Sequence, residues 1–367
     1  MTSVLDRAAL DALVAALAGR GYRVVGPTVR DDAIVLAELS SGADLPDGWG
    51  VDVAPGSYRL RRRGDGAAFA HSTGPQSWKQ FVHPPRRPIW SSDGRTFTLA
   101  EEEPPRYAFL GVRACDLASI AVLDRVLTGG GHPDGWYGRR RRGLFIVAVG
   151  CTEPGALCFC ASLGTGPEPG PGYDLSLTER VDADGPRYVV TIGSDDGAEV
   201  LAEVEHREAT PSEVDDARAA VTAAADRMGR RLPDTDLRTL FSENRESPVW
   251  DEVATRCLTC GNCTMVCPTC FCTTTEDRTD LAGNAERAQR WASCFEIDYS
   301  YLHGGSVRDS GASRYRQWIT HKLATWHDQF GMSGCVGCGR CIAWCPVGID
   351  ITAEANRLAE GNGDVHD

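Results

Sequence analysis

Two stretches of the chain carry four cysteines each in the same spacing, and they constrain its folding more than any other feature. The first holds Cys257, Cys260, Cys263 and Cys267 before Pro268, and the second holds Cys335, Cys338, Cys341 and Cys345 before Pro346. In this spacing three thiolates surround one face of a four-iron cube, and the cysteine before proline turns away to the other cube. The sequence therefore predicts two [4Fe–4S] clusters.

Each predicted cluster takes ligands from both stretches. We assign to a first site Cys257, Cys260, Cys263 and Cys345, and to a second site Cys335, Cys338, Cys341 and Cys267. A structural zinc site would instead use two cysteine pairs at a longer separation. Because each site needs a ligand from the other stretch, we expect the two stretches to fold as one unit.

The order of predicted elements divides the chain of 367 residues in two. Apolar runs at 107–112 and 144–149 predict strands that are buried on both faces, and helical patterns follow at 117–127 and 211–230. After residue 246 the pattern becomes helical around the cysteine stretches, which a long insert separates. We therefore predict an α/β domain over residues 1–245 and a mainly helical two-cluster ferredoxin-like domain over residues 246–367.

Three smaller expectations concern local structure. Residues 1–20 have the leucine spacing of an amphipathic helix. Strands are expected at 22–25 and 33–39, with Gly26 and Pro27 in a turn between them. The second half of the insert, 313–330, has helical spacing, ends at Gly331 and is expected to pack over a cluster.

Four of the seven remaining cysteines are expected to meet at one edge of the N-terminal sheet, and we call them the third site: Cys115, Cys151, Cys158 and Cys160. Cys115 and Cys151 follow the two apolar strands, and ligands bind at such strand ends in parallel sheets. Asp116 is expected to cap the next helix, whose N-terminus favours the negative charge of a thiolate-bound cluster. A third iron–sulfur cluster is one interpretation, and buried reduced cysteines that act as small apolar residues are the other.

The last three of the fifteen cysteines, which we call the cysteine trio, are Cys270, Cys272 and Cys294. They either fill the core or pack beside the cluster of Cys267, where they would influence its potential by S–H contacts and by excluding solvent. Packing is the interpretation that we favour for them.

Composition and missing motifs exclude several functions. The formal net charge is −13, so nucleic acid is not an expected partner, since its binding needs a basic surface. No apolar run is long enough to span a membrane, and fifteen cysteines without a signal peptide indicate the reducing cytoplasm. The sequence contains no dinucleotide, Walker or nucleophile-elbow motif. We therefore expect a non-catalytic chain that receives electrons from another polypeptide.

Several segments of the sequence resemble one known family. They are Gly111-Val112-Arg113-Ala114-Cys115-Asp116-Leu117, Cys158-Phe159-Cys160, Cys267-Pro268-Thr269-Cys270-Phe271-Cys272, and Gly337-Cys338-Gly339-Arg340-Cys341 with Trp344-Cys345-Pro346. In these segments the chain resembles the iron–sulfur β subunits of cytoplasmic NAD(P)-linked [NiFe] hydrogenases, also called sulfhydrogenases. The A subunit of anaerobic sulfite reductase is similar to the same group. The resemblance extends from about residue 74 to residue 353.

The resemblance implies an electron-transfer subunit placed between two partners. One is a flavin-bearing subunit that oxidises NAD(P)H, and the other is the pair of small and large [NiFe] hydrogenase subunits. The eight ligands of the first and second sites match the family motif one for one. The third-site cysteines also match family positions, but the resemblance alone does not settle whether they hold metal. Three alternatives stay open: the equivalent subunit of an anaerobic sulfite reductase, a non-catalytic iron–sulfur sensor or scaffold, and an enzyme with its own substrate at the N-terminal crevice.

Overall fold

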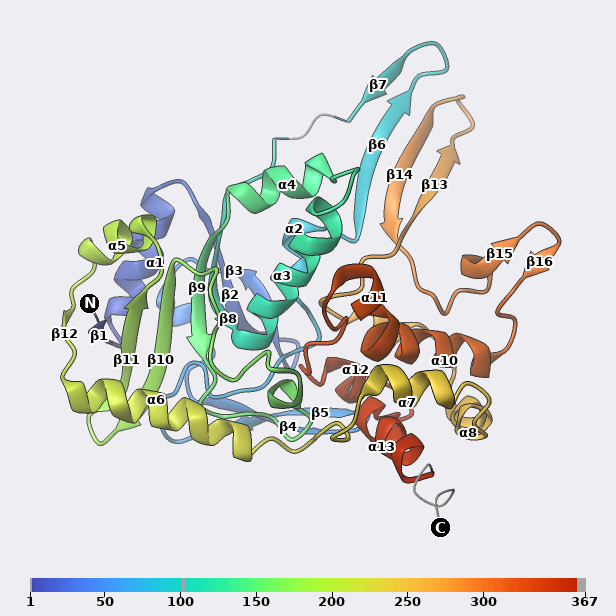
Figure 1. Ribbon diagram of the computed structural model, residues 1–367. Coiled ribbons are helices and arrows are strands. Elements are labelled where there is room, and N and C mark those ends of the chain that lie inside the picture. Colours follow the sequence, from blue (N-terminus) through green and yellow to red (C-terminus); the bar gives the residue numbers. More distant parts are fainter. Residues whose placement is uncertain (1, 101–102, 362–367) are drawn as a thin grey trace.

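The computed structural model describes residues 2–100 and 103–361, and its largest element is an eight-stranded sheet (Figure 1). The strand order is β12-β1-β11-β10-β9-β8-β2-β3. The strands are β1 (Thr2–Asp6), β2 (Arg23–Arg30), β3 (Ala33–Glu38), β8 (Tyr107–Arg113), β9 (Phe145–Gly150), β10 (Leu175–Asp182), β11 (Gly185–Ile192) and β12 (Arg207–Glu208). The central strands β10, β9, β8 and β2 run parallel, whereas the outer pairs are antiparallel.

Helices cover both faces of this sheet. One face packs on α1 (Ala9–Gly19) and α5 (Asp195–Ala202), and the other on α2 (Lys79–Val82), α3 (Ala114–Thr128), α4 (Gly135–Arg142) and α6 (Pro211–Asp226). On β8, Ala108 and Leu110 belong to the first core, and Phe109 and Val112 belong to the second. Because side chains of a strand point to both faces, a strand covered on both sides is apolar at nearly every position.

The start of the chain differs from the expectation. Residues 2–6 form strand β1 between β11 and β12, and the helix begins only at Ala9; Met1 lies outside the described residues. Gly26 and Pro27 lie inside β2 rather than in a turn. In both places pairing with another strand overrides the local pattern, which is common for strands.

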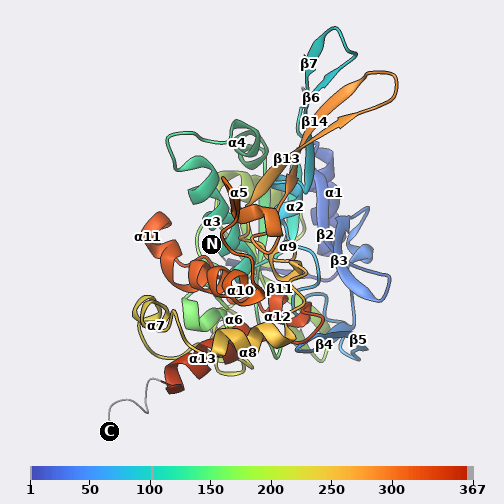
Figure 2. The same ribbon diagram turned by 90° about the vertical axis from the view of Figure 1, so that its right-hand side faces the viewer.

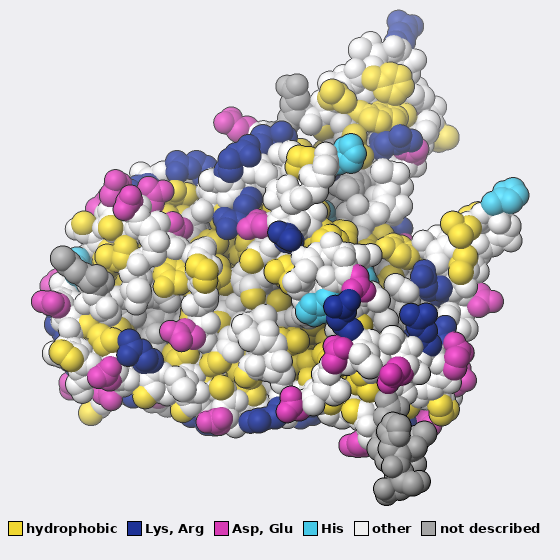
Figure 3. Space-filling view, in the orientation of Figure 1, with side chains coloured by type: hydrophobic (Ala, Val, Ile, Leu, Met, Phe, Trp, Pro, Cys, Tyr) yellow, Lys and Arg dark blue, Asp and Glu magenta, His cyan; other side chains and the backbone are white. Residues whose placement is uncertain are grey.

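A second, four-stranded sheet joins two parts of the chain that are far apart in sequence. Its order is β13-β14-β6-β7, made of β6 (Arg86–Ser92), β7 (Phe97–Leu99), β13 (Thr273–Thr279) and β14 (Ala285–Trp291). The sheet projects from the body as an arm (Figures 1 and 2). Hydrophobic side chains gather on it in the space-filling view (Figure 3), and Phe97 is 70% exposed. Strands β13 and β14 of this arm come from the insert between the cysteine stretches.

The C-terminal third contains both helices and strands. Its helices are α8 (Val249–Arg256), α9 (Asn262–Met265), α10 (Gly311–Thr320), α11 (Trp326–Phe330), α12 (Arg340–Ala343) and α13 (Ile351–Gly361), and α7 (Leu237–Glu243) packs on them. Besides β13 and β14 it holds the short hairpin of β15 (Tyr301–Leu302) and β16 (Gly305–Ser306); another hairpin, of β4 (Trp49–Ala54) and β5 (Ser57–Arg62), comes from the N-terminal part. The expected mixed α/β content is confirmed.

The expected helix at 313–330 is present with one irregularity. Residues His321–Thr325 form a π-helical turn between α10 and α11, and Gly331 ends the helix with a φ of 73°. Within residues 2–100 and 103–361, none of the helices combines the length and the apolar composition needed to cross a bilayer.

Candidate metal centres

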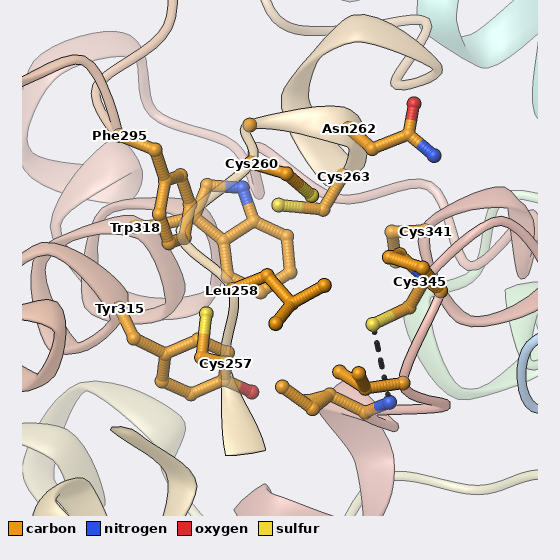
Figure 4. A pocket seen from close by; sticks show the side chains of 14 residues that line it. Cys257, Leu258, Cys260, Asn262, Cys263, Phe295, Tyr315, Trp318, Cys341 and Cys345 are labelled. Carbon is orange, nitrogen blue, oxygen red and sulfur yellow. Dashed lines mark hydrogen bonds between the residues drawn. The ribbon is translucent and has the colours of Figure 1, made fainter. Parts of the chain in front are cut away.

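The four cysteines of the first site line one cavity, together with Cys341 of the second site (Figure 4). Figure 4 shows Cys345 facing the other three first-site cysteines across the cavity. Aromatic side chains from the insert, among them Tyr315 and Trp318, form a wall of the same cavity, as expected for a helix packed over a cluster. Leu258 beside it is 61% exposed and Cys260 is exposed, so the first site reaches the surface.

The two cysteine loops have positive φ values at the same two places. Thr259 and Gly337 occupy equivalent places with φ values of 50° and 63°, and Gly261 and Gly339 follow with 73° and 75°. In each loop the N–H at the first of these places donates to the cysteine sulfur two residues earlier, over 3.4 Å in both cases. Amide N–H groups directed at sulfur suit a thiolate that carries cluster charge.

The thiols of the second site lie close enough to influence one another. Burial raises the pKa of Cys341, and the nearby thiols of Cys335, Cys338 and Cys267 raise it further. The pKa of Cys267 moves the other way, well below its usual value, because the thiol of Cys270 donates a hydrogen bond to it and outweighs burial. The structure therefore brings Cys267 to the other three cysteines across the long insert.

These sites fit a cluster better than a single ion. Within the described part of the chain, no group of three or more His, Cys, Asp or Glu side chains is arranged to hold one metal ion. A cubane binds each thiolate at a different iron atom, so it needs sulfur atoms spread around a space rather than converging on a point. The cavity of the first site meets that requirement.

Two buried lysines flank the second site, and neither was expected from the sequence. Lys322 is 3% exposed, and its Nζ donates to Thr269 Oγ1 over 2.7 Å and to the Gly334 carbonyl over 3.0 Å. Lys79 is 2% exposed and donates to the Cys270 carbonyl over 2.9 Å. The signal that could have revealed Lys322 is its position on the apolar stripe of its helix.

We expect Lys322→Met to lower the reduction potential of the second site. Burial lowers the pKa of Lys322, but the thiols of Cys267 and Cys270 outweigh this and raise it, so the ammonium keeps its charge and stabilises the added electron. A unit charge about 5 Å away at an effective dielectric constant of about 20 contributes roughly 3 kcal/mol. For a one-electron couple that corresponds to a fall on the order of 100 mV.

A redox titration monitored by electron paramagnetic resonance (EPR) measures this shift in potential. Lys322→Arg is the charge-preserving control and should change the potential much less. An unchanged potential in the methionine variant would contradict the electrostatic role of Lys322.

The third-site cysteines also approach one another. Cys115 is the second residue of α3 and Cys151 directly follows β9, so both lie at the carboxyl ends of neighbouring parallel strands. Cys115 packs in one core cluster with Cys158 and Cys160. Burial and the Cys151 thiol raise the pKa of Cys158 to about 12. The Arg113 guanidinium donates to Cys151 Sγ over 3.5 Å.

Asp116 does not cap the helix as expected. The N-cap residue is Arg113, without a side-chain cap bond. The Asp116 carboxylate instead pairs with Arg340 Nη2 over 2.8 Å, and both side chains are 3% exposed. This buried ion pair connects the helix after β8 to α12 in the second cysteine stretch, a tertiary contact that local sequence cannot reveal.

The third site touches the second through backbone. The N–H of Phe159 donates to the Gly337 carbonyl over 2.9 Å. A Cβ at Gly337 would lie 2.5 Å from the backbone N and Cα of Cys160. Thr259 adopts a similar conformation in the other loop, so this contact, rather than φ alone, requires glycine at 337.

Gly337→Ala should therefore destabilise the protein by about 1–3 kcal/mol through overpacking between the second and third sites. Thr259→Ala changes the equivalent residue of the other loop, keeps a Cβ there, and should shift stability by less than about 1 kcal/mol. Denaturant unfolding of the iron-loaded chain compares the two variants. Equal effects would contradict a specific contact at Gly337.

Comparison with known proteins agrees with this geometry. A family model described as a 4Fe-4S dicluster domain matches residues 256–349, which include both cysteine stretches. The chain is also similar to sulfhydrogenase 2 subunit beta of Pyrococcus furiosus, with 31% identity over 286 residues that cover 77% of this chain and 83% of the relative. No solved structure matches the chain. The chain therefore belongs to the sulfhydrogenase β-subunit family, as an iron–sulfur subunit of a hydrogenase-type complex.

Proposed function

We propose that this chain passes single electrons between a flavin-bearing NAD(P)H-oxidising subunit and the small and large subunits of a [NiFe] hydrogenase. The first and second sites would each hold a [4Fe–4S] cluster, and the third site would hold a further iron–sulfur cluster. The clusters supply the reversible one-electron chemistry. The chain's own residues position the thiolates, exclude water and provide buried positive charge beside them.

Contact among the three cysteine sites is the observation that carries this proposal. Cys341 of the second site lines the cavity of the first, and Asn262 Nδ2 donates to the Trp344 carbonyl between the two loops. The hydrogen bond between Phe159 and Gly337 joins the second site to the third. A path from the surface at the first site to the edge of the eight-stranded sheet suits transfer through the subunit better than it suits a sensor.

The choice of partners rests on the relative, whose name assigns it to a sulfhydrogenase. Rapid reduction of the clusters by NAD(P)H in the presence of the co-purifying flavoprotein would support the relay. Clusters that stay oxidised under those conditions would indicate a sensor or scaffold. Hydrogen uptake by the assembled complex supports the hydrogenase branch, and sulfite reduction without hydrogen uptake contradicts it.

Iron and acid-labile sulfide in the anaerobically purified chain test the cluster sites themselves. Two cubanes require about eight irons per chain, and a lower content would contradict the first and second sites. For the third site we expect Cys158→Ser to remove about four irons, the content of one cubane. An unchanged iron content in that variant would make the third-site cysteines buried thiols instead.

A further inference from the structure

A second cavity lies beside the second site and is lined by none of the cysteines assigned so far. All three members of the cysteine trio line it, together with Tyr299 and Lys322, and its polar wall is formed by Gln317, His321 and Gln329. Its volume is about 230 Å³. Because protein interiors are close-packed, a hollow of this size argues against three cysteines that merely fill core.

The backbone explains why the three sulfur atoms reach one place. Strands β13 and β14 pair Thr273 with Trp291, and the pairing continues beyond them, since the Ala292 N–H donates to the Cys272 carbonyl over 2.9 Å. Cys294 lies in the turn that follows this pairing, two residues beyond Ala292. Residues two apart in an extended segment point to the same face, so the base of the hairpin gathers the trio on one side.

The charges around the cavity are unbalanced without an anion. Lys322 lines the cavity and Lys79 holds the backbone of Cys270, and both are buried. Among residues 2–100 and 103–361, neither ammonium has a carboxylate partner; each lies over a tryptophan ring instead, Lys79 at 3.7 Å from Trp291 and Lys322 at 4.9 Å from Trp326. Buried charges are normally paired with opposite charge. An oxidised cluster held by four thiolates at the second site would carry a net charge of about −2, so it compensates both lysines. The two ammonium groups therefore favour thiolates around the cavity but do not by themselves require a further anion.

We propose that Cys270, Cys272 and Cys294 bind a further iron–sulfur cluster in this cavity. Iron would then replace the proton of the Cys270 thiol, which no longer donates its hydrogen bond to Cys267. Three thiolates would hold three irons of a cubane and leave one iron facing the polar wall. His321 is a nitrogen donor in that wall, and its Nε2 contacts Gln329 Oε1 over 2.9 Å. A histidine that binds metal through one ring nitrogen is commonly oriented by such a contact at the other.

This centre adds a branch to the proposed relay and does not depend on which partners the relay serves. Tyr299, whose Oη lies 3.2 Å from Cys272 Sγ, is 45% exposed. The neighbouring hairpin of β15 and β16 carries Tyr301 and Leu302, both more than half exposed. A cluster in this cavity would therefore lie close to the surface beside that hairpin.

Cys272→Ser/Cys294→Ser in the full chain tests the proposal by metal content. After anaerobic reconstitution with iron and sulfide we expect about four irons fewer than in the unaltered chain, while the EPR signals of the reduced first and second sites persist. Thr325→Val, which changes the same cavity wall without removing a cysteine, should keep the full content. Equal iron in the cysteine variant and the unaltered chain would overturn the proposal but leave the proposed relay intact.

A second measurement needs no variant and covers the case in which the double substitution fails to fold. A thiolate bound to iron is not free to react as a nucleophile. We expect Cys272 and Cys294 in the loaded, unaltered chain to stay unlabelled by iodoacetamide and to become labelled after chelation, which peptide mass spectrometry detects. Labelling of both residues while the eight cubane cysteines remain protected would overturn the proposal.

Discussion

Replacing Cys345 with serine should remove about four irons per chain, even though Cys257, Cys260 and Cys263 are untouched. Cys345 comes from the second stretch and faces those three cysteines across the cavity of the first site (Figure 4). Its Sγ accepts a hydrogen bond from the Ile349 N–H over 3.3 Å, so the loop before α13 is arranged around this sulfur. Iron and sulfide analysis of the anaerobically purified variant measures the loss.

The same substitution should also lower the stability of the C-terminal third by several kcal/mol, because cluster binding contributes directly to folding when the unfolded chain has no preformed site. Thermal unfolding of the loaded protein measures this effect. Val347→Ala is the matched control, since Val347 lines the same cavity on the same loop but carries no ligand atom. A serine variant with the full iron content would contradict the assignment of Cys345 to the first site.

The proximity of the cysteines in the first and second sites could be predicted from their spacing, and that of the third-site cysteines from strand ends. Four cysteines in eleven residues leave few ways to reach a cube, so the pairing of Cys267 and Cys345 with the opposite stretch follows from local geometry. Cys115 and Cys151 could be placed together because each follows a strand buried on both faces, and such strands lie side by side in a parallel sheet. In both cases the decisive information is local in the sequence.

The arm could not be predicted, because its stability depends on pairing between distant segments. Strand β13 reads Thr-Thr-Thr-Glu-Asp-Arg-Thr, with no alternation of apolar and polar residues. Its partner β14 pairs with β6 from the first third of the chain, with Ala285 opposite Ser92. A strand that is polar on both faces gives almost no periodic signal, and only the run of β-branched threonines favours an extended segment.

The buried charges were missed for a related reason. Charged residues in a sequence are normally assigned to the surface, yet four cations near the cysteine sites are at most 6% exposed: Lys79, Arg113, Lys322 and Arg340. Burial of these cations is favourable only when negatively charged thiolates or clusters lie nearby, and that proximity is visible only in the tertiary structure. Arg340 and Asp116 illustrate this most clearly, because neither position suggests the other in the sequence.

Arg340→Met is expected to destabilise the loaded chain by about 3–5 kcal/mol, the usual cost of breaking a buried ion pair from one side. The change leaves the Asp116 carboxylate buried and unpaired. Cys338 lies two residues before Arg340 and belongs to the second site, so the unpaired carboxylate of Asp116 would also lie near an anionic cluster. Both effects act in the same direction, and denaturant unfolding under anaerobic conditions measures their sum.

Asp116→Asn should cost clearly less than Arg340→Met, and this asymmetry identifies the cluster as part of the charge balance. Without the carboxylate, the guanidinium of Arg340 still has a negative neighbour in the thiolate-bound cluster of the second site, so its charge stays compensated. The double variant Arg340→Met/Asp116→Asn should recover part of the loss of the arginine variant, since it removes both buried charges. Equal destabilisation by the two single variants in the loaded protein would mean that the cluster of the second site does not compensate the charge of Arg340. That result would contradict the electrostatic coupling between this ion pair and the second site.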